Sequence, residues 1–170
     1  MGCGMVADSG DSDGARFDRC TFIGTTNWSA WPSKPHFRFA DCRFTGALVR
    51  AYGDADPARA AQFVRCVLDD DPAHSPTGSV YGGTNGDHPL ADLSDARNML
   101  FDRCRFLATH GGALPWSTGA IYRDCTMVQG KHPTGFPRGR YEGRNTIVGK
   151  VDLYGSKVAG ALLVNGKPVH

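Results

Sequence analysis

Carboxylate and histidine side chains in and after one acidic segment have the types needed for acid–base chemistry. Two carboxylates about 5–10 Å apart hydrolyse glycosidic bonds, and a histidine exchanges protons near neutral pH. The candidate catalytic residues are Asp70, Asp87, His88 and His110. The sequence does not fix their separation in space. A solvated turn is the alternative for the run Asp69–Asp71.

Aromatic side chains outside the repeated part of the chain suit the binding of sugars. The C–H face of a pyranose is apolar and packs flat against an aromatic ring such as indole. The candidate ligand-binding residues are Trp31, Arg50, Tyr52, Tyr81 and Trp116. For both tryptophans the alternative is that the ring packs against the protein wall. A turn-capping role is likewise the alternative for His110.

The elements that must position these residues follow from one short phrase that recurs along the chain. Residues 15–22 read ARFDRCTF, and related phrases occupy 37–44, 61–68, 99–106 and 120–127. Each phrase has an aromatic residue, two further residues, a cysteine, one residue and an apolar side chain. The five cysteines follow one another at spacings of 22, 24, 38 and 21 residues. Self-similarity at such a period is the signature of a solenoid.

The alternation inside each phrase predicts β-strands. Each half has a period of two, and the three-residue step from aromatic to cysteine breaks it, as a corner between strands does. A coil of about 20–24 residues is too short for two packed helices and fits one turn of a parallel β-helix. A weaker sixth phrase at 140–147 has Asn145 in place of the cysteine. We predict one all-β domain over residues 1–170, a parallel β-helix of six or seven coils.

These phrases resemble the coils of right-handed parallel β-helix proteins of the pectin-lyase-like superfamily, over roughly residues 15–150. The resemblance implies a right-handed solenoid. The superfamily includes polysaccharide lyases, glycoside hydrolases, epimerases, phage tailspikes and non-catalytic binding proteins, and no motif in this chain selects one of them. We therefore expect a carbohydrate-binding or polysaccharide-processing protein with a glycan in a groove along the wall. If it is an enzyme, a lyase or a hydrolase is expected. The alternative is a structural, spike-like segment that self-associates through its ends.

The cysteines share one frame, which predicts a single internal column. Disulfides need facing Cβ atoms and a torsion near a right angle, which parallel stacked side chains do not offer. We predict buried free thiols that pack as small apolar side chains. A zinc site needs a CxxC pair or a Cys/His cluster, and the chain has neither, so no cofactor is predicted. The run Asp11-Ser12-Asp13-Gly14 is an incomplete calcium loop.

Two segments depart from the repeat. Residues 69–95 contain six Asp and no Lys or Arg, and they predict an excursion from the wall, with a degenerate coil as the alternative. An excursion can overhang only the neighbouring coils, which contain Tyr52 on one side and His110 with Trp116 on the other. The predicted site is thus a groove with an aromatic floor and an acidic lip. Residues 150–170 still alternate and predict a further coil or a terminal cap.

Composition excludes some classes of function. A net charge of +2 does not favour nucleic acid as a partner. No run of about 18 apolar residues is present, so no membrane span is expected. The N-terminus lacks the pattern of a signal peptide. Localisation is therefore left open, and an extracellular or envelope location is expected if the chain is part of a longer protein.

Overall fold

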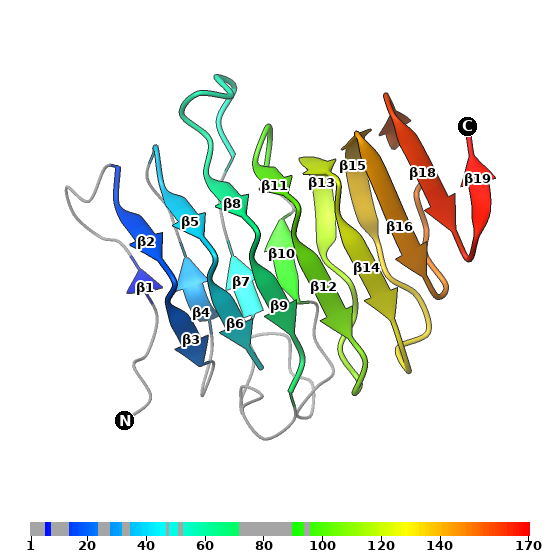
Figure 1. Cartoon of the computed structure of the whole chain (residues 1–170), viewed down its shortest axis with the longest axis horizontal. Coiled ribbons are helices and arrows are strands. Elements are labelled where there is room, and N and C mark those ends of the chain that lie inside the picture. The colour runs from blue at the N-terminus through cyan, green and yellow to red at the C-terminus, as the bar shows by residue number, and fades with distance from the viewer. Residues whose placement is uncertain are drawn as a thin grey trace.

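Short strands separated by tight corners make up the described part of the chain. The computed structural model describes residues 6–7, 14–23, 28–31, 35–46, 48–50, 53–71, 90–93 and 96–170. These residues wind into a parallel β-solenoid of about five turns and contain no helix. Figure 1 shows the strands of successive turns side by side. The predicted all-β parallel β-helix is confirmed. It has fewer turns than the six or seven predicted, because residues 150–170 form short strands and a hairpin.

The strands belong to two sheets. The first sheet contains β1 (Val6–Ala7), β2 (Arg16–Asp18), β4 (Trp28–Trp31), β5 (Arg38–Ala40), β7 (Leu48–Arg50), β8 (Gln62–Val64), β10 (Ala91–Leu93), β11 (Leu100–Asp102), β13 (Trp116–Arg123), β15 (Pro137–Glu142) and β17 (Lys157–Val158). The second contains β3 (Thr21–Ile23), β6 (Arg43–Thr45), β9 (Val67–Asp69), β12 (Arg105–Ala108), β14 (Thr126–Gln129), β16 (Arg144–Val148), β18 (Ala161–Val164) and β19 (Lys167–Val169).

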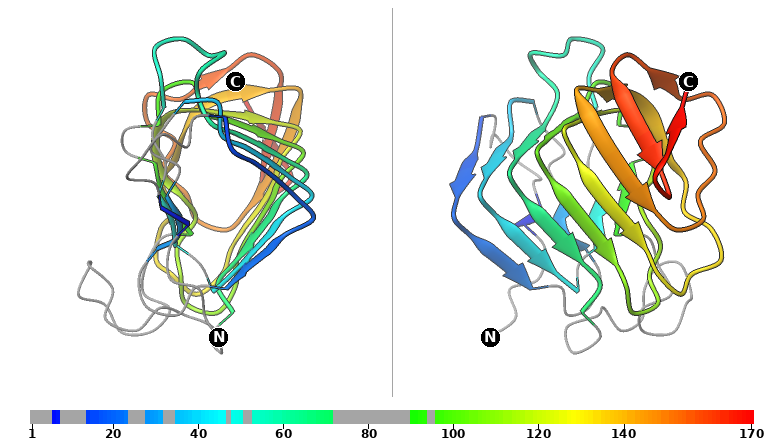
Figure 2. Two further views of the ribbon diagram at one scale, coloured as in Figure 1. Left: turned by 90° about the vertical axis from the view of Figure 1, so that its left-hand side faces the viewer. Right: turned by 45° about the vertical axis from the view of Figure 1, so that its right-hand side comes forward.

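The first sheet changes character along the solenoid axis. Strands β4, β7 and β10 form one row and β5, β8 and β11 form another, and both rows meet at β13. Strand β13 has eight residues and spans both rows, and β15 pairs with it along most of its length. Figure 2 shows the stacked coils end on, with the two sheets on either side of the interior. The later coils therefore present a broader continuous wall than the earlier ones.

The residue before each cysteine turns the chain from the first sheet to the second. These residues have a φ of 53° or 54° although none is glycine: Arg19, Asp41, Arg65, Arg103 and Asp124. Each also donates its backbone N–H to a carbonyl of the next coil. A left-handed conformation costs a non-glycine residue about 1–2 kcal/mol, so the stacked coils impose it. The break in alternation that the phrase shows is this corner.

An aromatic column fills the interior, as the repeated phrase predicts. Neighbouring rings are stacked at centroid distances of 4.8 to 5.7 Å. The column consists of Phe17, Phe39, Phe63, Phe101, Tyr122 and Tyr141. A second column from the other sheet, including Phe44 and Phe106, meets it edge-on. These rings provide most of the large buried side chains.

The last two members of the column are tyrosines, and both hydroxyls have partners. The Tyr122 hydroxyl lies 2.7 Å from Ser117 Oγ, which donates to the Arg138 carbonyl at 2.8 Å. The Tyr141 hydroxyl donates to the Pro137 carbonyl. Burial raises the pKa of both phenols, so they remain donors. Both bonds tie the interior of the solenoid to the backbone at the start of β15.

The cysteines form an internal column of their own, as the sequence predicts. Cys42, Cys66, Cys104 and Cys125 are buried free thiols, and Cys20 at the first coil is partly buried. Each buried thiol donates to the carbonyl of the aromatic residue one coil earlier, at Sγ–O distances of 3.6, 3.5, 3.3 and 3.2 Å in chain order. Burial raises the pKa of Cys42 to about 11. Burial also raises the pKa of Cys104, so these two thiols remain protonated donors.

Asn145 takes the place of cysteine in the sixth coil and makes a different pair of hydrogen bonds. Its Oδ1 accepts the N–H of Cys125 at 2.9 Å, and its Nδ2 donates to the Glu142 carbonyl at 2.8 Å. The side chain is buried with both of its polar atoms bonded. An amide is tolerated there because no polar atom is left unpaired.

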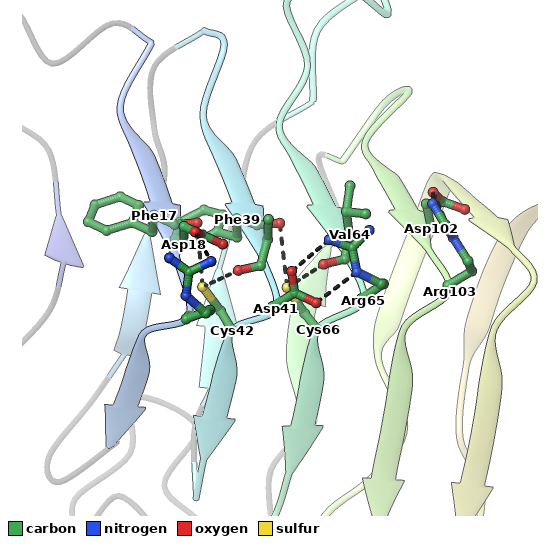
Figure 3. Close-up of polar contacts among 12 residues, drawn as sticks. Phe17, Asp18, Phe39, Asp41, Cys42, Val64, Arg65, Cys66, Asp102 and Arg103 are labelled. Atoms are coloured by element: carbon green, nitrogen blue, oxygen red, sulfur yellow. Dashed lines mark hydrogen bonds and ion pairs between the residues drawn. The ribbon is translucent and has the colours of Figure 1, made fainter.

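Charged corner residues outside the cysteine column pair with neighbours. The Asp41 carboxylate accepts two bonds from Arg65 of the next coil, at 2.7 and 2.6 Å. Arg103 instead binds Asp102, the preceding residue. Figure 3 shows the Asp41–Arg65 pair beside the thiols of Cys42 and Cys66, and the Asp102–Arg103 pair one coil further on. Asp41 and Arg65 thus form an ion pair between two stacked coils.

We expect the thiol column to be protected from reagents in the native state. Cys42, Cys66, Cys104 and Cys125 are at most 2% exposed, so they should react with a maleimide only after unfolding, whereas Cys20 should react earlier. Mass spectrometry of peptides after timed labelling gives the rate at each site. Rapid labelling of the four buried thiols in folded protein would contradict the internal column.

The acidic segment and the C-terminal end are partly described. Strand β9 ends at Asp69, and β10 lies in the wall between β7 and β13. Residues 72–89 lie outside the described residues, so the predicted excursion over 69–95 stays a prediction. At the other end β18 continues the second sheet, and β19 pairs with it antiparallel. Within the described residues, no helix long and apolar enough to cross a membrane is found.

Candidate ligand-binding groove

The structure describes the predicted site residues to different extents. Tyr52, Tyr81, Asp87 and His88 lie outside the described residues. Trp31 and Arg50 are described only by their backbone, in β4 and β7. Side-chain geometry is therefore established for Asp70, His110 and Trp116. Asp11 and Asp13 of the incomplete calcium loop also lie outside the described residues.

Three predicted ligand-binding residues occupy one register row of the first sheet. Arg50 pairs with Asp92, and Asp92 pairs with Trp116. The pairing of Ala30 with Val49 brings Trp31 next to Arg50 one residue later. Equivalent positions on neighbouring strands lie about 4.8 Å apart. The row of Trp31, Arg50, Asp92 and Trp116 thus follows the solenoid axis across β4, β7, β10 and β13.

Two adjoining cavities lie at the C-terminal end of this row, over β13, β15 and β17. They have volumes of about 420 and 380 Å³ and share Thr118 and Arg138. We call them together the β13–β15 groove. Its principal lining residues are Trp116, Ser117, Thr118, Phe136, Arg138, Arg140, Tyr154 and Lys157. Trp116 therefore lines this groove, whereas the groove predicted beside residues 69–95 falls largely outside the described residues and stays a prediction.

The alternation of β15 explains which side chains face the groove. Tyr141 belongs to the internal aromatic column, so Arg140 and Arg138 lie on the outer face of the strand. Gly139 between them lies against β13, because an added Cβ would lie 2.3 Å from the Ala120 carbonyl oxygen. A larger residue there would push β15 away from β13. The floor of the groove thus depends on this glycine.

Arg138 is the fixed centre of the groove. Its guanidinium carbon lies 5.5 Å from the centroid of the Phe136 ring and 5.9 Å from that of Tyr154. Its NH2 group donates to Asp152 at 2.6 Å. The Tyr154 N–H and the Arg138 guanidinium hold the pKa of Asp152 below its usual value. Two rings and one carboxylate therefore hold this cation in place.

Arg140 and Lys157, which also line the groove, extend its positive charge beyond Arg138. Arg140 binds Glu142 at 2.5 Å, and Arg123 binds the same carboxylate at 2.7 Å. Lys157 is the register partner of Arg140 on β17. Among the described residues, no salt bridge to Lys157 is found. The groove thus combines aromatic rings with an excess of positive charge.

Asp70 and His110 lie together outside the groove, just after the ends of β9 and β12. The Asp70 carboxylate is buried and accepts four backbone N–H bonds, from residues 109, 110, 111 and 112. His110 Nδ1 lies 3.3 Å from Asp70 Oδ1, and its side chain is 53% exposed. Burial alone would raise the pKa of Asp70, but the four amides together lower it.

This geometry makes Asp70 an anchor for the next coil. A carboxylate that accepts several backbone amides is strongly held as the anion, which makes it a poor proton donor. His110 and Asp70 are not among the residues that line the groove. A catalytic role for His110 therefore stays a prediction. No cluster of three or more metal-binding side chains is found in the part of the chain that the structure describes.

Most of the groove residues were not predicted from the sequence. Phe136, Arg138 and Arg140 lie in a basic loop and strand, and Tyr154 and Lys157 lie in the tail. One signal was available, because placing Tyr141 in the aromatic column puts Arg138 and Arg140 on the outer face. Tyr154 and Lys157 have no such signal, since the phrase does not extend past residue 147.

Comparisons of the chain with protein-family models, with curated proteins and with solved structures found no match.

Proposed function

We propose that this protein binds an extended glycan along the outer wall of the first sheet, with the β13–β15 groove as its main site. One observation carries the proposal. Three aromatic side chains, Trp116, Phe136 and Tyr154, line a groove around the fixed cation Arg138. Aromatic faces pack against sugar rings, and a few polar groups in such a site orient the ligand.

The row that leads to the groove supports an extended ligand. Trp31, Arg50, Asp92 and Trp116 follow one another along the axis. A linear chain lying on this row would meet a new strand at each step of about 4.8 Å. We also propose membership of the right-handed, pectin-lyase-like β-helix proteins, with the stacked aromatic–cysteine coils as its support.

Binding without cleavage is the proposed activity. Of the four candidate catalytic residues, the structure describes Asp70 and His110, and neither lines the groove. Asp70 is engaged by four backbone amides. A lyase or hydrolase would need an acid and a base beside the bound sugar. Substrate cleavage in a panel of polysaccharides would replace binding by catalysis as the function.

Trp116→Ala should weaken glycan binding about tenfold. Loss of one stacked ring removes roughly 1–2 kcal/mol of favourable contact, and about 1.4 kcal/mol corresponds to a factor of ten. A glycan array followed by calorimetry on the best ligand measures the change. Trp116→Phe should retain most of the affinity, and His110→Ala should leave it unchanged.

A second variant separates loss of the site from loss of the fold. Thr118 is exposed and lies where the two cavities meet, so Thr118→Gln should obstruct the groove without emptying the core. It should also weaken binding. The proposal fails if the wild type binds no glycan, or if neither variant changes the affinity.

A structural, spike-like role is the alternative, and one observation favours it. At the first coil, Phe17 and Phe22 are only partly buried and Ile23 is 41% exposed. Exposed apolar groups at the edge of a sheet invite pairing with another chain. Light scattering across a range of concentrations would detect self-association, and substitution of Ile23 by lysine should then abolish it.

A further inference from the structure

We propose that the β13–β15 groove recognises an anionic group on the sugar, a carboxylate or a sulfate ester, through Arg140 and Lys157. This inference rests on the proposed glycan binding and specifies the class of glycan. The closest described carboxylates are already engaged, Asp152 by Arg138 and Glu142 by Arg123 and Arg140. The cations here are Arg123, Arg138, Arg140 and Lys157. Against two carboxylates they leave a surplus of two positive charges.

The register of β15 and β17 places like charges side by side. Arg140 pairs directly with Lys157 in the parallel ladder, and both side chains are exposed. Like charges at directly opposite positions destabilise a sheet. The corner residues Asp41 and Arg65 show the opposite arrangement, a stacked pair of unlike charge, while Arg16 and Arg38 on β2 and β5 form a second like-charged pair. An anion bound between Arg140 and Lys157 would remove the repulsion.

Arg138 completes a cationic face. It lies two residues before Arg140, so both side chains project from the same side of β15. The rings of Phe136 and Tyr154 hold its guanidinium. The backbone at Arg138 is held as well, because the Ser117 hydroxyl donates to the Arg138 carbonyl and is itself hydrogen-bonded to the buried Tyr122 hydroxyl. The cation is therefore preorganised before any ligand arrives.

The aromatic lining favours a charged sugar over a free inorganic anion or a nucleic acid. Tyr154 is 83% exposed beside the cations, so a ligand that binds there needs an apolar face as well as a charge. A nucleic acid would need a longer basic track that neutralises many phosphates. Away from the groove, several arginines are paired with aspartates instead, including Arg43, Arg65 and Arg103.

The test compares matched ligands that differ only in charge. A polyuronate and its methyl-esterified form share one backbone, and a sulfated glycan and its desulfated form provide the second pair. We expect the wild type to bind at least one anionic form about tenfold more tightly than its neutral partner, with weaker binding at high salt. The pair that shows this difference identifies the anion as carboxylate or sulfate.

Matched variants assign the effect to the two cations. Lys157→Gln and Arg140→Gln should each weaken binding of the anionic form about three- to tenfold and leave the neutral form unchanged. Lys157→Arg should restore it. Lys167→Gln removes an exposed lysine outside the groove and should have no effect.

The outcomes distinguish this inference from the proposed function. Equal binding of charged and neutral forms would overturn the anionic specificity and leave glycan binding in place. Absence of binding to every form would overturn both. Tighter binding of single-stranded DNA than of any glycan, lost in Lys157→Gln, would overturn the sugar assignment. Unchanged affinity of both glutamine variants for the anionic form would overturn the assigned residues.

Discussion

Asp70→Ala is expected to lower the free energy of unfolding by about 3–5 kcal/mol. The Asp70 carboxylate accepts the backbone N–H groups of four consecutive residues, at distances of 2.8 to 3.0 Å. Its removal leaves those donors without their acceptor, in a turn where Gly112 is buried. Urea unfolding followed by circular dichroism measures the change.

The control for Asp70 is an aspartate on the surface. Asp18 pairs with Arg19, and both side chains are at least half exposed, so Asp18→Ala should change the stability by less than about 1 kcal/mol. A similar small effect for Asp70→Ala would show that the turn finds other acceptors. It would also reopen the question of whether the carboxylate is free for chemistry.

The contribution of Asp70 should depend on pH in one direction. The folded state lowers the pKa of this carboxyl, so folding favours the ionised form. The stabilisation is therefore fully present above the unfolded-state pKa of about 3.9 and is lost as the pH falls through the lower folded-state pKa. The stability difference between wild type and Asp70→Ala should shrink below about pH 4. A difference that stays constant on acidification would contradict the assignment.

Gly149→Ala is expected to destabilise the solenoid by about 2–5 kcal/mol. Gly149 has a φ of 112°, and an added Cβ would lie 2.3 Å from the Gln129 carbonyl oxygen. That oxygen belongs to the backbone of the neighbouring coil and cannot move aside alone. Asn165 holds Gly149 from the other side by two hydrogen bonds. Thermal and urea unfolding report the loss.

Gly166→Ala separates backbone strain from the steric clash. Gly166 has a φ of 76° in the turn between β18 and β19, and an added Cβ would meet nothing within 4 Å. Alanine there should cost only about 1–2 kcal/mol from its left-handed conformation. Equal losses of stability in the two variants would mean that the coil of Gly149 moves away from Gln129 and relieves the clash at no cost in free energy.

The interior of the solenoid could be predicted from the sequence because each coil repeats the same spacing of inward-facing residues. The aromatic and cysteine positions recur in one frame, and stacking the frames places Phe39 on Phe63 and Cys66 beside Cys104 without any further information. Even the exception at Asn145 occupies the frame, since its amide bonds to Cys125 of the preceding coil and to Glu142 of its own. The number of turns was less predictable, because the pattern continues into a tail that forms a hairpin.

The outer surface is less readable because no repeat constrains it. Asp70 was predicted as a catalytic candidate, yet its partners are backbone amides about 40 residues later. Every non-proline residue has a backbone N–H, so residue types do not indicate which amides a carboxylate will bind. The groove depends on Tyr154 and Lys157 being brought beside Arg138 and Arg140, which follows from the pairing of β15 with β17. Trp116 was a candidate from the sequence, but the groove that it lines between β13 and β15 is a different one from the groove predicted beside residues 69–95.

The free thiol column affects how the described coils respond to reductants and oxidants. The five described cysteines are free, so a reducing environment has no cross-link among them to break. Oxidants act on the thiolate, and burial disfavours that form at Cys42 and Cys104. Oxidants should therefore react slowly with Cys42 and Cys104 while the coils remain stacked, and first with the partly buried Cys20. The stacking of coils 15–147 is thus held by packing and hydrogen bonds and by no covalent link among the five described cysteines.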